Sequence, residues 1–325
     1  MSAYSGMAAR MMCLLAMIFA APAIAQDNYP SSTVRLIMGF PPGGSTDVVA
    51  RLLAQKLSAQ MNASVIVDYR IGNEGHIGAD YVAKSRPDGH TVFMNVPSQI
   101  LGPAFNLKLS YDVFRDLAPL SLLSNSPQLL VMHPSLPVST PAEFIAFIRQ
   151  RPDKLAYSSA GPGSVTHLSP LLFLQTNRLN ALHIPFKGSG PAMVGLVTGE
   201  TQFAMQSIVS VLPMIKQKRL KAIAISSLKR SPLLPEAPTL SETVMPKFEV
   251  GSWVGALVPA RTPPAIIRRL NDEMVKALHD PAVKSLLDTQ GIESLGTTHE
   301  EYGNYLRGEF ERWSKVIKAA GLKVE

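Results

Sequence analysis

The run from Phe40 to Asp47 constrains the fold most, because it has to join a strand to a helix within a few residues. The apolar stretch Val34–Met38 predicts a strand, and Pro41-Pro42, which cannot donate to a sheet ladder, ends it. Gly43-Gly44 permits backbone angles that other residues avoid and allows a close approach to the main chain. A tight strand-to-helix turn follows from this order of residues.

Ser45, Thr46 and Asp47 are residue types that begin helices, and the helix is expected from Val48 to about Gln60. The first N–H groups of such a helix have no partner within it, so they favour an anion. The same turn without a ligand is an open alternative. A nucleotide loop is excluded, because neither Gly-Lys-Ser/Thr nor G-x-G-x-x-G occurs at the turn.

Residues 1–25 have the pattern of a secretory signal peptide. Arg10 supplies the positive charge, Met11–Ala21 is the apolar run, and Ala23-Ile24-Ala25 fits the small-x-small cleavage pattern. We therefore predict cleavage near Ala25-Gln26 and export of the mature protein, which the family resemblance described below places in the periplasm.

The chain contains one cysteine, Cys13, and it lies in the predicted signal peptide. The mature protein would then have no disulfide, no cysteine nucleophile and no thiolate metal site. The net charge of +7 is mild and no block of basic residues occurs, so nucleic acid is not an expected partner. We also expect no cofactor and no metal ion.

Short apolar strands alternate with amphipathic helices, which predicts an α/β fold with largely parallel sheets. Two proline-bearing stretches, 117–128 and 231–250, are interpreted as crossings between two lobes. Lobe 1 is predicted to comprise residues 26–122 and 251–325, and lobe 2 residues 123–250. Two crossings form a hinge, with a ligand cleft between the lobes. The strands are expected at 34–38, 65–68, 91–95, 129–132, 155–158, 181–184, 202–205, 221–225 and 253–258.

Small polar residues and glycines recur at the carboxyl ends of the predicted strands, where parallel sheets bind ligands. These segments are 70–78, 158–167, 185–190 and 205–207. Any one of them could be a structural turn, but together they predict one site shared by two lobes.

No catalytic set emerges, since neither a G-x-S-x-G elbow nor an H-E-x-x-H helix is present. His76 and Asp80 are one helical turn apart, but no third metal ligand is near in the sequence. His167 with Ser164 is the one pair that a hydrolase or isomerase would use. Lys187 would attract a carboxylate if it faced the cleft, although a lone lysine is more often solvated.

The chain resembles the substrate-binding proteins of tripartite tricarboxylate transporters, also called Bug receptors, over residues 26–325. The motifs that carry the resemblance are Gly39–Asp47 with Ala50-Arg51, Gly75–Ala79 with Val82-Ala83, Pro87–Thr91, Ser158–Leu168, Pro185–Gly188 with Pro191-Ala192, Leu220–Ala224, Pro235–Thr239 and Trp253–Gly255.

The resemblance implies a two-lobed, periplasmic-binding-protein-like fold of type II, a Venus flytrap, and a receptor without catalysis. Such a receptor captures a small organic acid in the interlobe cleft and delivers it to the permease subunits of a tripartite transporter. We expect a monomer. The alternatives are a secreted hydrolase or isomerase that uses the same cleft, and a ligand sensor for a signalling partner. The residues expected at the ligand are Phe40, Gly43, Gly44, Ser45, Thr46, Asp47, Gly75, His76, Ser98, Gly163, Ser164, Thr166, His167, Lys187 and Gln206.

Two positions depart from the pattern of the family. Asn73-Glu74 precedes Gly75 where relatives usually carry alanine, and Thr201-Gln202 replaces a common aspartate. If Gln202 lay at the edge of the cleft, the loss of an acid would favour a simple carboxylate over an amino acid.

Overall fold

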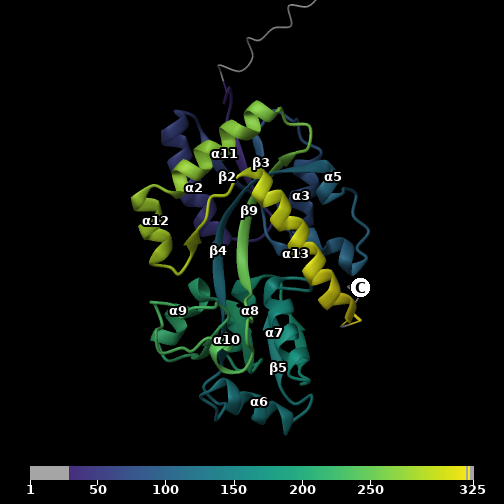
Figure 1. Ribbon diagram of the computed structural model, residues 1–325, viewed down its shortest axis with the longest axis vertical. Coiled ribbons are helices and arrows are strands. Elements are labelled where there is room, and N and C mark those ends of the chain that lie inside the picture. The colour runs from purple at the N-terminus through teal and green to yellow at the C-terminus, as the bar shows by residue number, and fades with distance from the viewer. Residues whose placement is uncertain (1–28, 320, 323–325) are drawn as a thin grey trace, which may run out of the picture.

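The computed structural model describes residues 29–319 and 321–322 of the chain (Figure 1). The predicted signal peptide and its cleavage site lie outside the described residues. The first half contains β1 (Val34–Met38), α2 (Ser45–Met61), β2 (Val65–Tyr69), the 3-10 helix η2 (Asn73–Gly75), α3 (His76–Ala83), β3 (Thr91–Asn95), α4 (Pro97–Leu101), the 3-10 helix η3 (Gly102–Phe105), α5 (Val113–Asp116), β4 (Leu117–Met132), α6 (Pro141–Arg149) and β5 (Ala156–Ser159). The second half contains α7 (Val165–Thr176), β6 (Leu182–Pro185), α8 (Ser189–Val197), β7 (Phe203–Ser207), α9 (Ile208–Lys216), β8 (Lys221–Ile225), α10 (Leu240–Thr243), β9 (Gly251–Pro259), α11 (Pro264–Leu278), α12 (Pro281–Asp288), β10 (Glu293–Ser294) and α13 (His299–Ala319).

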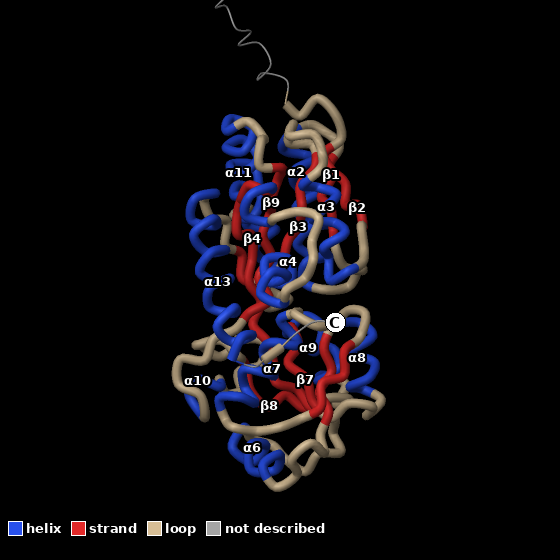
Figure 2. The backbone as a smooth tube through the Cα atoms, turned by 90° about the vertical axis from the view of Figure 1, so that its right-hand side faces the viewer, coloured by secondary structure: helices blue, strands red, loops and turns tan. Residues whose placement is uncertain are grey.

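The strands form two connected sheets, and the fold is the two-lobed α/β fold expected from the sequence (Figures 1 and 2). Lobe 1 is built on the order β2-β1-β3-β9-β4-β10, and lobe 2 on β8-β4-β7-β5-β6. β1 is parallel to β2 and β3, and β5 is parallel to β6 and β7. The strands that pair with β4 are antiparallel to it.

Strand β4 belongs to both sheets. It pairs with β9 from Leu117 to Pro127 and with β7 from Gln128 to Met132. The first predicted crossing is therefore mostly strand, not a linker. Its proline at position 119 lies at a shift of register, where a β-bulge relaxes the need for a ladder donor. The exact lobe boundaries given above stay a prediction.

The second crossing lies beside the first, and hydrogen bonds hold the two together. Ser226, just after β8, accepts a bond from Val250 N through its carbonyl at 3.2 Å. Its hydroxyl accepts one from Gln128 N at 2.8 Å and donates to Val250 O. Both crossings are thus joined at the level where β4 passes from one sheet to the other.

Apolar side chains cover both faces of each sheet. In lobe 1, α2 and α11 pack on one face through residues such as Leu53 and Leu270. The other face carries α3 and α13, and this cluster continues into lobe 2 through Trp313 and Phe203. A third cluster lies under α8 and α9. None of the helices in the described ranges combines the length and apolar character needed to span a membrane.

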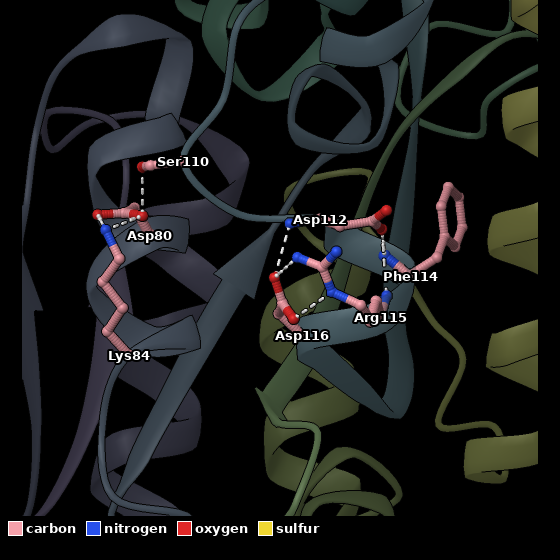
Figure 3. Close-up of polar contacts among 7 residues, drawn as sticks. All are labelled: Asp80, Lys84, Ser110, Asp112, Phe114, Arg115 and Asp116. Atoms are coloured by element: carbon pink, nitrogen blue, oxygen red, sulfur yellow. Dashed lines mark hydrogen bonds and ion pairs between the residues drawn. The ribbon is translucent and has the colours of Figure 1, made fainter.

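Polar side chains stabilise the short helices α3 and α5 of lobe 1 (Figure 3). Asp112 caps α5, since its Oδ1 accepts hydrogen bonds from Phe114 N at 2.9 Å and Arg115 N at 3.1 Å. On α3, Asp80 pairs with Lys84 at 2.7 Å and accepts a bond from Ser110. Asp80 is therefore held by a surface network with Lys84 and Ser110.

Gly255 of β9 leaves the space that Tyr302 of α13 occupies, because a Cβ at this position would lie 2.8 Å from Cε1 of the Tyr302 ring and closer still to its Cζ and Oη. Gly255→Ala should lower the free energy of unfolding by about 1–3 kcal/mol through overpacking. Gly308→Ala on the exposed face of α13 meets no atom within 4 Å and should raise it by about 0.5–1 kcal/mol. Urea unfolding measures both, and equal midpoints for the two variants would contradict this packing.

Candidate functional site

A cavity of about 160 Å³ lies between the two lobes. Its wall comes from β1 and the start of α2 in lobe 1, and from the ends of β5 and β7 with the following helices in lobe 2. This volume is below the roughly 300–1,000 Å³ typical of drug-sized ligands, so the cavity suits a small molecule. The lining residues are 38, 40–47, 96–98, 160, 164–166, 188–190, 207, 210 and 252.

Four helices of eight or more residues begin at this cavity. The N-cap residues of α2, α7, α8 and α9, which are Gly44, Ser164, Gly188 and Ser207, all line it. In α2, α8 and α9 no side chain of the N-cap residue caps the first turn. Free N–H groups and four helix dipoles therefore make the cavity electropositive without a cation.

The loop before α2 is held by Asp47. Its Oδ2 accepts a hydrogen bond from Gly43 N at 3.2 Å, which closes the turn around Gly44. Arg51 Nε lies 3.0 and 3.1 Å from the two carboxylate oxygens, and the Tyr69 hydroxyl donates to Oδ1. Asp47 is the one charged side chain among the described lining residues, and Arg51 neutralises it.

The loop after β5 forms the facing wall. Ser164 Oγ donates to Gly161 O at 2.7 Å and accepts a bond from His167 N at 3.3 Å. Thr166 Oγ1 accepts a bond from Ala160 N at 2.8 Å. Both hydroxyls thus hold their own loop in shape while they line the cavity.

His167 lies behind this loop and does not line the cavity. Its Nδ1 accepts a hydrogen bond from Gly163 N at 3.1 Å, and its ring stacks on His183 with the centroids 4.0 Å apart. Burial lowers the pKa of His167 to about 3, with a smaller contribution from His183. The neutral His167 ring therefore supports Gly163. It forms no hydrogen bond to Ser164 Oγ, as a general base for this hydroxyl would.

Gly75 and His76 lie behind the lobe 1 wall. A Cβ at Gly75 would lie 3.3 Å from the ring of Phe40, which does line the cavity. His76 Nδ1 is 2.7 Å from the Tyr111 hydroxyl, and burial lowers the pKa of His76 to about 4. Gly75 thus supports the wall, whereas His76 lines a separate pocket with Asp80 and Tyr111, and a ligand contact of either residue stays a prediction.

Lys187 and Gln206 are also placed away from the cavity. Lys187 is exposed to solvent, whereas Gly188 next to it lines the wall. Gln206 is buried, but its neighbour Ser207 is the lining residue of β7. Adjacent side chains of a strand point to opposite faces, and the sequence does not show which face is the wall.

Several lining residues were missed because only tertiary structure brings them to the cavity. Ser210 of α9 and Ser252 of β9 are far apart in the sequence and carry no motif. The glycine-rich loop before α8 was recognised, but its contribution was assigned to Lys187. The residues expected at the ligand that do line the cavity are Phe40, Gly43, Gly44, Ser45, Thr46, Asp47, Ser98, Ser164 and Thr166.

The structure contradicts the assumption that Gln202 lies at the edge of the cleft, where its neutral side chain would favour a simple carboxylate. This residue lies just before β7, at the opposite end of the strand from the cavity. Its side-chain oxygen accepts a hydrogen bond from Ala156 N at 2.8 Å, and its amide nitrogen donates to Gly199 O at 3.2 Å. Gln202 therefore pairs with backbone and gives no information on the ligand.

Comparison with known proteins agrees with this geometry. Residues 49–322 match the family model described as "Tripartite tricarboxylate transporter family receptor". Protein BugT of Bordetella pertussis is 35% identical over 308 residues, which cover 94% of each chain. A UPF0065 protein from the tcbD-tcbE intergenic region of Pseudomonas sp. strain P51 is 36% identical, over 90% of this chain and 87% of the relative.

Solved structures of receptors share the fold. Rpa4515 of R. palustris with adipate has a TM-score of 0.85 and 32% identity, over 91% of this chain and 99% of that one. MatC of Rhodopseudomonas palustris with bound malate has a TM-score of 0.82 and 30% identity, over 89% and 100%. The periplasmic binding protein BugD has a TM-score of 0.84 and 28% identity, over 91% and 100%. The chain belongs to the tripartite tricarboxylate transporter receptor family, the Bug receptors.

Proposed function

We propose that this protein is a non-catalytic periplasmic receptor that captures a small dicarboxylate, of a chain length between malate and adipate, in the interlobe cavity. It would then present the closed, loaded form to the permease subunits of a tripartite transporter. The observation that carries the proposal is the convergence of four helix N-termini on one small cavity.

The wall supports a dicarboxylate for two reasons. Helix N-termini from both lobes offer backbone N–H donors, so each end of an extended diacid can meet its own set of donors. Between these donors lie apolar side chains, among them Met38, Phe40 and Val165, which suit a methylene chain. The two R. palustris structures with adipate and malate support the same ligand class.

Binding would place each carboxylate on dipoles rather than on a cationic side chain. Hydrogen bonds to a charged group contribute about 1.5–3 kcal/mol each. A few of them, less the cost of ordering the lobes and the ligand, reach about −8 kcal/mol, which is micromolar affinity. An uncharged ligand of the same shape would lose most of the binding free energy that these charge-assisted hydrogen bonds supply.

The test is a thermal-shift screen of mature protein that has been unfolded and refolded to remove carried-over ligand. Malate and adipate form the first set, with amino acids and sugars as controls and adipamide as the matched uncharged analogue of adipate. At about 100 times its dissociation constant, a ligand should add about 2.7 kcal/mol of stability and raise the Tm. Stabilisation by adipamide equal to that by adipate would contradict anion recognition, and no shift with either diacid would contradict the ligand class.

Gly43 has φ of +104°, in the region that side chains rarely adopt, and it lines the cavity. Gly43→Val should weaken binding of the diacid at least tenfold, because it strains the turn and displaces its amides. Gly199→Val is the matched control, since Gly199 has φ of +83° but lies away from the cavity. Both variants should lose stability in urea, and only Gly43→Val should lose affinity in isothermal titration calorimetry. Wild-type affinity in Gly43→Val would remove this loop from the site.

A further inference from the structure

Three glycines of lobe 2 face residues of lobe 1 around the cavity, and two of them, Gly161 and Gly163, leave space that a side chain would fill. A Cβ at Gly163 would lie 2.9 Å from the ring of Phe105, and one at Gly188 would lie 3.4 Å from Pro41. A Cβ at Gly161 would lie 2.7 Å from the carboxyl carbon of Glu74. The lobes are thus in contact around the cavity, and one of the three contacts is made by an ionisable group.

The backbone of Glu74 is held in an unusual conformation. Its φ is +52°, and Asn73 before it has φ of +46°. A left-handed glutamate is strained, so it persists only where its surroundings hold it. Ser98 Oγ and Gln99 Nε2 donate to Glu74 O at 3.1 and 2.7 Å, and Ser98 also lines the cavity.

The carboxyl group of Glu74 is half-buried against lobe 2 and forms no ion pair with another described residue. Its Oε2 is shielded from solvent and has no hydrogen-bond partner among the described residues. Burial raises the pKa of Glu74 to about 7, and no charged group adds to this shift. The elements packed against it offer Ser98 and Gln99 of α4 and the uncharged loop around Gly161, while the neighbouring His76 faces Tyr111.

We propose that Glu74 is a proton-dependent latch, a side chain that packs on Gly161 in the closed protein most favourably when its carboxyl group carries a proton taken from solvent. Closure of the lobes would then take up one proton, and the capture of the ligand would depend on pH through a residue that does not touch the ligand. The predicted pH dependence of ligand capture rests on the proposed function. The predicted pH dependence of lobe closure does not.

The direction of the pH dependence follows from the pKa of Glu74 in the open form and in the closed form. In the open form Glu74 is solvated, with a pKa near the ordinary value of about 4.3. In the closed form burial raises its pKa to about 7. The group therefore favours closure fully below the open-state pKa, and this contribution is lost as pH rises through the closed-state pKa. Affinity should fall by up to about tenfold per pH unit between about pH 5 and pH 7, then level off.

The experiment compares wild type, Glu74→Gln and Glu200→Gln as mature proteins. Glutamine has the shape of a protonated glutamate and never ionises, and exposed Glu200 is a matched charge control away from the cavity. Isothermal titration calorimetry with adipate or malate at pH 6.5, in buffers of different ionisation enthalpy, counts the protons taken up. The same titrations at pH 5.5 and 8.5 give the change in Kd.

At pH 6.5, wild type and Glu200→Gln should take up about three-quarters of a proton more per bound diacid than Glu74→Gln, because a group with a closed-state pKa of about 7 is mostly but not fully protonated there. Glu74→Gln should bind more tightly than wild type at pH 8.5. Equal proton uptake in wild type and Glu74→Gln would overturn the latch. Subtraction of the Glu74→Gln data also removes the titration of the diacid itself.

A second measurement needs no ligand and so separates failure of the latch from failure of the proposed function. In small-angle X-ray scattering, ligand-free Glu74→Gln should be more compact than wild type at pH 8.5, and the two should agree at pH 5.5. Identical scattering of the two proteins at both pH values would overturn the latch even if no carboxylate binds.

Discussion

The continuous strand β4 is the constraint on which the rest of the structure depends. Because it pairs with β9 in one sheet and with β7 in the other, it holds the carboxyl ends of β1, β5 and β7 toward one cavity. Each helix that follows these strands must then begin at the cavity, since strand and helix are joined by a few residues. The electropositive wall is therefore a consequence of topology, and it needs no lysine or arginine.

Recognition of an anion by backbone amides, which we propose for this cavity, would have physical consequences that a cationic site would not have. Backbone N–H groups are fixed before the ligand arrives, so little free energy is spent on ordering side chains. The one charged lining residue, Asp47, is balanced by Arg51 and organises the turn through Gly43. Side-chain charge at the cavity is thereby almost cancelled, so the shape of the cavity and the direction of the helix ends would decide selectivity. In the proposed latch, Glu74 would add a titratable group beside the cavity that closure buries.

Local sequence signals predicted strands and helices well where the residues within the element and its flanking turns determine its bounds. Strands β1, β3 and β8 have the expected bounds, and α2 begins directly after the glycine pair. The first part of β4 was missed, because two prolines indicate a linker unless their places in the sheet are known: Pro119 lies at a bulge, and Pro127 lies where the pairing of β4 with β9 ends. At the site, the residues expected from the continuous motif Phe40–Asp47 line the cavity. Gln206 and Lys187 do not, but their neighbours Ser207 and Gly188 do.

The sequence by itself determined the α/β class, the strand-to-turn-to-helix segment from Phe40 to Asp47 and the family, because these depend on local backbone chemistry and on contiguous motifs. Only the tertiary structure decided which face of each strand is the wall, that Ser210 and Ser252 join it, and that His167 stacks on His183 behind it. The reason is that side-chain direction and long-range pairing depend on register between strands, which no local pattern encodes. The contact between Glu74 and Gly161 belongs to the same class, since it exists only where two lobes meet.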